Sequence, residues 1–160
     1  GGTALFAEAG DGRETRVTAT LGLRPTAAIR IEGSVVRSRI LRDRDNSEFA
    51  RSTIPRVKLE FQPKRSLFFR LITEYRNDRR APLVDPFTGN ALYVGNTLAG
   101  EQAFRGLRVD WLVSFKPTPG TVAFFGYGAS LERNRPLYNT DALERTSDGF
   151  FVKLAYLVRR

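Results

Sequence analysis

Carboxylates and basic groups are the side chains that could carry chemistry in this sequence, because its 160 residues include no histidine and no cysteine. Imidazole acid–base catalysis, a Ser-His-Asp triad, a thiolate nucleophile and a disulfide framework are therefore excluded within this chain. Carboxylate catalysis remains, with Asp43 and Asp45 or Glu74 and Asp110 as candidate acid–base pairs. These carboxylates are interleaved with arginines, so we interpret them as ion-pair partners. We predict that the chain is not an enzyme and holds no cofactor and no metal, while a longer parent protein stays undecided.

Residues 43–47 (DRDNS) resemble the start of a calcium-binding loop in their acidic spacing. Such a loop needs glycine at its sixth position and a bidentate glutamate at its twelfth. Glu48 and Ile54 stand at these two positions instead. We therefore predict a solvated loop.

A larger set of charged side chains occupies alternate positions in several segments, with basic residues in excess. In a β-barrel such a wall either lines a water-filled lumen that favours anionic solutes or forms ion pairs that hold a closed interior together. We favour the structural role. The candidate lumen-lining residues are Arg30, Glu32, Arg56, Lys58, Glu60, Arg70, Glu74, Arg108, Asp110, Lys116 and Lys153.

Alternation of apolar and polar residues positions these charges, and a period of two is typical of β-strands. In the segment from Leu67 to Tyr75, the odd positions are mostly apolar and the even positions include Arg70 and Glu74. The same period predicts strands over residues 17–23, 29–35, 57–61, 107–116, 121–132 and 150–158, with a further short strand over 3–9. The candidate lipid-facing residues are Leu67, Phe69, Leu71, Leu107, Val109, Trp111, Val113, Phe115, Phe125, Tyr127, Leu154 and Tyr156.

Short and long connections alternate between these segments. Turn-forming residues make the short connections at 24–27, 62–66 and 117–120. The long, polar connections cover 41–53, 77–102 and 133–148. Outer-membrane barrels have short periplasmic turns and long extracellular loops, and this polarity places the C-terminus in the periplasm.

Three features favour a membrane-embedded barrel over a soluble sheet. One side of the strands is apolar over about the 9 to 11 residues that a tilted membrane strand needs. The other side is ionic, whereas a soluble barrel fills its interior with apolar side chains. Aromatic residues are expected near strand ends, as in the girdles of membrane barrels, at Phe61, Tyr75, Trp111, Phe115, Tyr127 and Tyr156. No apolar run approaches the roughly 18 residues of a membrane-spanning helix, but barrel strands need no such run.

We therefore predict an all-β fold, an antiparallel up-and-down transmembrane β-barrel in the bacterial outer membrane, with about seven or eight strands present. The chain begins Gly1-Gly2-Thr3 without a targeting segment, so we interpret residues 1–160 as a single barrel domain whose N-terminal parent part is missing. Its function would be that of a pore or of an anchor for a carbohydrate-handling module. The alternative is a soluble β-barrel or sandwich that binds an acidic ligand.

The predicted barrel and the net charge of +9 together indicate the partners expected for this chain. The expected partners are outer-membrane lipid, lipopolysaccharide and the outer-membrane assembly machinery. Nucleic acid is not expected, because the aromatic residues lie mainly on the apolar side, away from the charges. Arginines in the loops and rims are expected to be solvated, with contact to lipopolysaccharide phosphates as the alternative. They are Arg42, Arg44, Arg79, Arg80, Arg133 and Arg135.

Three segments resemble the barrel of a large bacterial family described only as a domain of unknown function: residues 106–128 (GLRVDWLVSFKPTPGTVAFFGYG), 145–157 (RTSDGFFVKLAYL) and 81–89 (APLVDPFTG). In that family a carbohydrate-binding module of the family-nine type usually precedes the C-terminal outer-membrane barrel. The resemblance spans most of the chain and is strongest after Arg80. It implies the C-terminal part of a barrel larger than eight strands, with carbohydrate bound through the missing module. The last residues, 157–160 (LVRR), depart from the terminal aromatic that usually ends such barrels.

Overall fold

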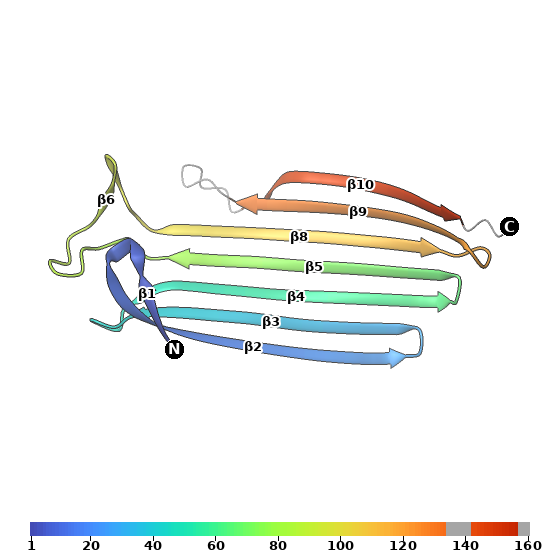
Figure 1. The fold of residues 1–160 in the computed structure, drawn as a ribbon, viewed down its shortest axis with the longest axis horizontal. Helices are drawn as coiled ribbons and strands as arrows, with labels where there is room; N and C mark the ends of the chain where they lie inside the picture. Colours follow the sequence, from blue (N-terminus) through green and yellow to red (C-terminus); the bar gives the residue numbers. More distant parts are fainter. Residues whose placement is uncertain (134–141, 157–160) are drawn as a thin grey trace.

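The computed structural model describes residues 1–133 and 142–156, and their regular structure is almost entirely β (Figure 1). Eight strands form one antiparallel sheet whose order follows the sequence, and a two-stranded hairpin stands apart from it. This confirms the prediction of an all-β, antiparallel, up-and-down fold with seven or eight strands. The sheet strands are β1 (Gly2–Leu5), β2 (Gly10–Thr26), β3 (Ile29–Arg42), β4 (Glu48–Lys64), β5 (Leu67–Arg80), β8 (Gln102–Phe115), β9 (Thr121–Arg133) and β10 (Glu144–Tyr156), and the hairpin is β6 (Tyr93–Val94) with β7 (Thr97–Leu98).

The sheet is open, with a free edge at each end of its strand order. β1 pairs only with the stretch from Gly10 to Arg13 of β2, so the rest of β2 forms one edge. β10 pairs with β9 and forms the other edge. In this structure the sheet is therefore not closed into a barrel.

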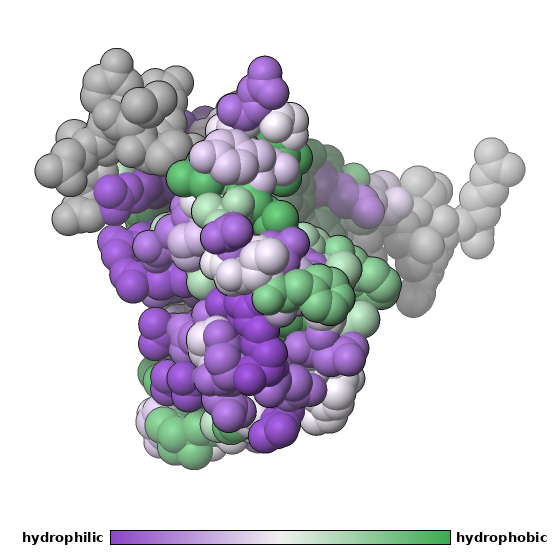
Figure 2. Space-filling model, turned by 90° about the vertical axis from the view of Figure 1, so that its left-hand side faces the viewer, coloured by the Kyte–Doolittle hydropathy of each residue, from purple (hydrophilic) through white to green (hydrophobic). Residues whose placement is uncertain are grey.

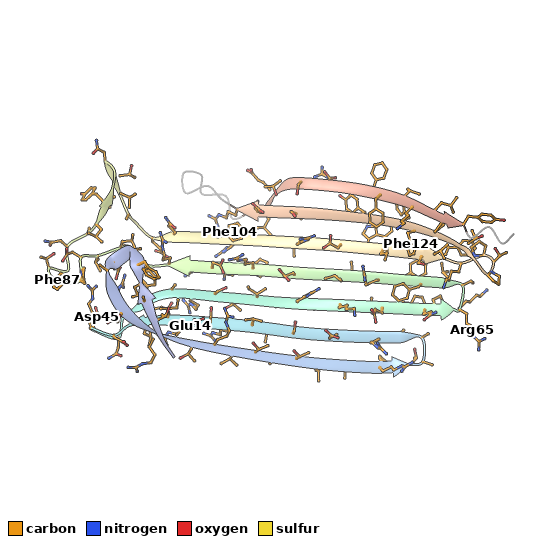
Figure 3. All side chains as sticks on the ribbon, in the orientation of Figure 1. Glu14, Asp45, Arg65, Phe87, Phe104 and Phe124 are labelled. Atoms are coloured by element: carbon orange, nitrogen blue, oxygen red, sulfur yellow. The ribbon has the colours of Figure 1, made fainter. Side chains whose placement is uncertain are left out.

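Successive connections lie at opposite ends of the sheet (Figure 1), but the predicted alternation in length fails at residues 43–47, which are as few as residues 116–120 of a short connection. Residues 27–28, 65–66 and 116–120 make the short connections. Arg65 lies at this end, whereas Asp45 and Phe87 lie at the long-loop end (Figure 3). The end of β10 also lies on the short-connection side (Figure 1). Residues 134–141 of the last loop, and 157–160 with the predicted departure from a terminal aromatic, are outside the described residues.

Several predicted boundaries are wrong. β3 and β4 extend into the predicted loop of residues 41–53 and leave only residues 43–47 between them, and β5 continues to Arg80. Backbone pairing does not require an apolar side chain, so the strands run on where alternation of hydrophobicity stops. Residues 3–9 are not one strand either, because β1 ends at Leu5 and a 3-10 turn, Phe6–Glu8, follows.

The strand register gives the sheet two faces of different chemistry. Residues directly opposite each other in antiparallel strands share a face. The pairings Leu71 with Trp111 and Trp111 with Tyr127 define what we call the apolar face, and all the candidate lipid-facing residues lie on it. The pairings Arg30 with Glu60 and Glu60 with Arg70 define the ionic face.

The candidate lumen-lining residues lie on the ionic face with one exception. Lys116 is not on a strand, because it follows the end of β8 and its backbone N–H donates to the carbonyl oxygen of Ser66 at 2.7 Å. Lys116 thus belongs to the short connection after β8, although the alternation predicted it as part of the strand.

Aromatic residues of the apolar face pack against one another across the strands. The ring centroid of Trp111 lies 5.1 Å from that of Phe125 and 6.4 Å from that of Tyr127. Phe115 and Tyr156 end their strands, as predicted for girdle residues, but Trp111 and Tyr127 lie well inside β8 and β9. For these two residues the prediction of a place near a strand end is wrong.

The buried core of the described residues is small and consists of Leu5, Phe49 and Leu83 at the long-loop end. The apolar face stays largely uncovered, and on the edge strands Leu21 is 64% exposed and Leu154 is 71% exposed. No helix among the described residues has the length and apolar character needed to cross a membrane. The described structure is thus a single β-layer with one small cluster packed at its end.

Candidate functional site: the ionic face and its buried ion pair

Ion pairs that keep at least partial contact with solvent connect charged residues along the ionic face. Glu60 contacts the Lys58 Nζ at 2.9 Å and the Arg30 Nη1 at 3.8 Å. The Arg108 Nε donates to the Asp110 Oδ2 at 2.9 Å. Pairs in contact with solvent contribute only about 0–1 kcal/mol each. Their main consequence is chemical, since they engage the carboxylates that acid–base catalysis would need.

The candidate acid–base carboxylates each lie beside an arginine. Glu74 lies opposite Arg108 in the register, and Asp110, its diagonal neighbour on the same face, accepts from Arg108. Asp43 lies 3.6 Å from Arg13, and Asp45 lies 3.5 Å from Arg44. The arrangement favours an ionic ladder over a catalytic dyad.

Basic residues outnumber acidic ones among the predicted residues that lie on this face. The basic residues are Arg30, Arg56, Lys58, Arg70, Arg108 and Lys153, and the acidic ones are Glu32, Glu60, Glu74 and Asp110. Within the described part of the chain, Arg70 and Lys153 have no carboxylate at ion-pair distance. The ionic face therefore carries an excess of positive charge.

A buried ion pair between Glu8 and Arg42 lies at the long-loop end of the ionic face. The Arg42 Nε donates to the Glu8 Oε2 at 2.7 Å, and the Nη2 donates to the Oε1 at 2.5 Å. Arg42 also donates to the Pro82 carbonyl oxygen at 2.9 Å, and the Val84 N–H donates to the Glu8 Oε1 at 3.0 Å. The side chains of Glu8 and Arg42 are only 2% and 7% exposed. The pair thus joins the N-terminal segment, the end of β3 and the connection after β5.

Local backbone features bring Glu8 to this position. The 3-10 turn ends at Ala9 in the left-handed region, with φ 47°, and this reverses the chain into β2. Leu5 then packs over Gly12, where an added Cβ would come within 2.9 Å of the Leu41 carbonyl oxygen and 3.1 Å of the Leu5 side chain. Only glycine permits this close approach. We call residues 1–12 together with residues 81–101 the cap.

Several interactions set the pKa of Glu8. Burial acts to raise it, but hydrogen bonds from Arg42 and from the Val84 N–H, together with the positive charge of Arg42, outweigh burial. The pKa of Glu8 therefore lies below its ordinary value of 4.5. A carboxylate held in this way stays charged in acid well below neutrality.

Sequence reasoning did not find this ion pair. Glu8 fell in a predicted strand, and Arg42 was expected to be a solvated rim residue or a contact to lipid phosphates. The sequence separation of the two residues hides their contact, because a period-two pattern describes only one strand at a time. The one available signal was that Arg42 continues the even-numbered positions of β3 that carry Arg30 and Glu32.

The other arginines that were candidate phosphate contacts lie in different parts of the structure. Arg44 lies 3.5 Å from Asp45 and donates to the Asp85 carbonyl oxygen at 3.0 Å. Arg80 lies on the ionic face, opposite Ala50, whereas Arg79 and Arg133 lie on the apolar face. Arg135 is outside the described residues.

The acidic loop residues organise turns. The Asp45 Oδ1 accepts from the Ser47 N–H at 2.9 Å, and the Asp85 Oδ1 accepts from the Thr88 N–H at 2.7 Å. The hydrogen bonds from Ser47 and from the Thr88 and Phe87 N–H groups, respectively, lower the pKa of Asp45 and of Asp85. No group of three or more metal-ligating side chains gathers within residues 1–133 and 142–156.

The long-loop end, viewed directly in Figure 2, is largely hydrophilic with smaller apolar patches. Phe6 and Phe87, which are 93% and 92% exposed, belong to the cap at this end. The long-loop end of the ionic face is therefore polar, and the cap lies at this end.

Comparison of the chain with protein-family models, with curated proteins and with solved structures finds no match.

Proposed function

We propose that this chain forms part of the wall of a bacterial outer-membrane β-barrel, with its apolar face toward lipid and its ionic face toward the interior. The observation that carries the proposal is a broad single-layer sheet with an uncovered apolar face on one side and an ionic face on the other. A membrane barrel requires this combination, because its strands alternate lipid-facing and interior-facing residues.

The size of the apolar face supports the same proposal. Along β5 the apolar side runs over nine residues, from Leu67 to Tyr75. A tilted membrane strand needs about 9 to 11 residues. In the proposed orientation the short connections are periplasmic and the long loops, with the cap, are extracellular.

The cap favours an anchor for a carbohydrate-handling module over an open pore. The buried pair of Glu8 and Arg42 fastens the cap against the ionic face at the end where a lumen would open. The excess positive charge of that face would favour anions in any water that it encloses.

The alternative is a soluble β-barrel or sandwich that binds an acidic ligand. In a sandwich a second sheet would cover the apolar face. Within the described residues, that face has no covering layer, and Leu154 and Tyr156 are 71% and 72% exposed. This observation favours the membrane proposal.

Trp111, the single tryptophan of the chain, lies on the apolar face and reports directly on the proposal. In vesicles of phosphatidylcholine with brominated acyl chains, we expect strong quenching of Trp111 fluorescence and little quenching by aqueous iodide. The matched control W111F/L112W moves the indole to the ionic face and should reverse this pattern. Iodide quenching of Trp111 without quenching by brominated lipid would contradict the proposal.

A further inference from the structure

Arginines replace apolar residues on the apolar face as each of several strands approaches the long-loop end. On β3, Ile31 and Val35 are followed on the same side by Arg37 and Arg39. On β5 the apolar positions end at Tyr75, and Arg79 follows. The change from apolar to cationic side chains therefore occurs at the border of the apolar band and on its long-loop side.

The register aligns these arginines across the sheet. Arg39 lies directly opposite Arg51, and Arg51 lies directly opposite Arg79. In the adjacent row, Arg37, Thr53, Asn77, Arg105 and Arg133 are successive partners on β3, β4, β5, β8 and β9. We call the six arginines the arginine rows: Arg37, Arg39, Arg51, Arg79, Arg105 and Arg133.

Like charges directly opposite each other destabilise a sheet, so this alignment calls for negative charge nearby. Glu48 supplies some of it, at 2.8 Å from the Arg39 Nε and 3.2 Å from the Arg51 Nε. Arg37 and Arg79 are exposed and have no carboxylate at ion-pair distance within the described residues. Glu48 thus serves two arginines of the inner alignment, Arg39 and Arg51, while Arg37 and Arg79 beside them lack a carboxylate within the described residues.

We propose that the arginine rows bind the phosphate groups of lipid A in the outer leaflet. The inference rests on the proposed function, because the rows reach a headgroup only when the adjoining apolar band lies in the membrane. Guanidinium groups bind phosphate oxygens in a bidentate manner. Basic residues at a membrane surface strengthen contact with anionic lipid. The long-loop end is the extracellular end of the proposed barrel, so the phosphorylated lipid on that side is lipid A.

Energy transfer from Trp111 to dansyl-labelled lipids measures which lipid surrounds the inserted chain. The full chain is refolded into phosphatidylcholine vesicles that contain labelled lipid A, labelled lipid A without its phosphates, or labelled phosphatidylglycerol. We expect lipid A to be bound on the order of 100-fold more tightly than its dephosphorylated form, since each exposed arginine near an anionic surface contributes roughly a factor of five.

Two matched variants test whether the rows are responsible. R37Q/R39Q/R51Q/R79Q removes four charges from the rows and should abolish most of the preference for lipid A. R30Q/R56Q/R70Q/R108Q removes four charges from the ionic face and should leave the preference intact. The single variant R79Q, at an exposed arginine, should weaken binding about fivefold.

Equal binding of lipid A and its dephosphorylated form, or an unchanged preference in the row variant, would overturn the inference. Equal preference for phosphatidylglycerol would replace lipid A with anionic lipid in general and overturn its choice as the partner. A chain that shows neither energy transfer to any labelled lipid nor quenching by brominated lipid has not inserted. That outcome would contradict the proposed function itself, and so the two failures are distinguishable.

Discussion

At the scale of single residues, the pair of Glu8 and Arg42 differs from the other ion pairs of the chain. It is buried and bidentate, and each partner also bonds to the backbone of the connection after β5. The pairs on the ionic face instead keep at least partial contact with solvent. Removing one partner of a buried pair leaves an uncompensated charge and costs about 3–5 kcal/mol, whereas an exposed pair contributes about 0–1 kcal/mol.

We expect the cap to open in acid. The folded-state pKa of Glu8 lies below 4.5, so its contribution to stability is complete above that value and is lost as pH falls through the lower folded pKa. E8Q should weaken protection of the cap at neutral pH by about 3 kcal/mol and reduce this pH dependence, leaving the part that comes from Asp85. Hydrogen exchange of residues 1–12 and 81–101, corrected for intrinsic rates, measures both effects.

The control for this experiment is E101Q, because Glu101 is exposed in the same connection. It should leave cap protection unchanged at every pH. Protection in E8Q equal to that of the unaltered chain would show that the ion pair does not hold the cap.

At the scale of elements, β9 and β10 fit together through glycine. Phe151 lies opposite Gly126, and a Cβ at Gly126 would come within 2.3 Å of the Phe151 Cε1. The ring thus lies over bare backbone on the ionic face. Such aromatic cover of a glycine helps to fix the register of an edge strand.

We expect G126V to destabilise the pairing of β9 with β10 because it displaces the Phe151 ring. The loss should be smaller when F151A has already removed that ring, with a coupling of about 0.5–3 kcal/mol between the two sites. Denaturant unfolding followed by Trp111 fluorescence measures each variant, since Trp111 lies opposite Tyr127 on β9. G22V serves as the control, because nothing lies within 4 Å of a Cβ at Gly22. Strict additivity of G126V and F151A would refute this packing.

At the scale of the whole molecule, most side chains of the sheet have no second layer to pack against. The buried core is confined to Leu5, Phe49 and Leu83, while the apolar face extends across the strands from β2 to β10. Exposed apolar patches larger than a few hundred Å² are rare on soluble monomers. In the proposed function, lipid covers the apolar face.

We therefore expect the full-length protein to be recovered in the outer-membrane fraction of its host. After extraction in detergent it should migrate faster on a denaturing gel before boiling than after boiling, as a closed barrel resists unfolding by detergent. Recovery in the soluble fraction without detergent would instead mean that another protein layer covers the apolar face.

The faces of the sheet could be predicted from sequence because the side-chain period of a strand is preserved across an antiparallel register. This is why Trp111 and Glu60 were assigned to opposite faces correctly. Arg79 and Arg133 were among the candidate phosphate contacts, but their alignment with the other arginines of the rows was missed because the predicted strands stopped where hydrophobicity stopped. Extending the odd positions of Ile29 and Val35 to Arg37 and Arg39 would have found them. The cap was missed for another reason, since no local pattern links Glu8 to Arg42.

The direction of the two edge strands determines whether an odd or an even number of further strands could close this sheet into a barrel. Seven long strands, β2, β3, β4, β5, β8, β9 and β10, alternate in direction, so the first and the last point the same way (Figure 1). If these two edges met, the seam would be parallel, and a ring built from copies of this sheet would have a parallel seam at every junction. A closed barrel with antiparallel neighbours throughout has an even number of strands. To complete such a barrel, an odd number of further strands must enter between β10 and β2.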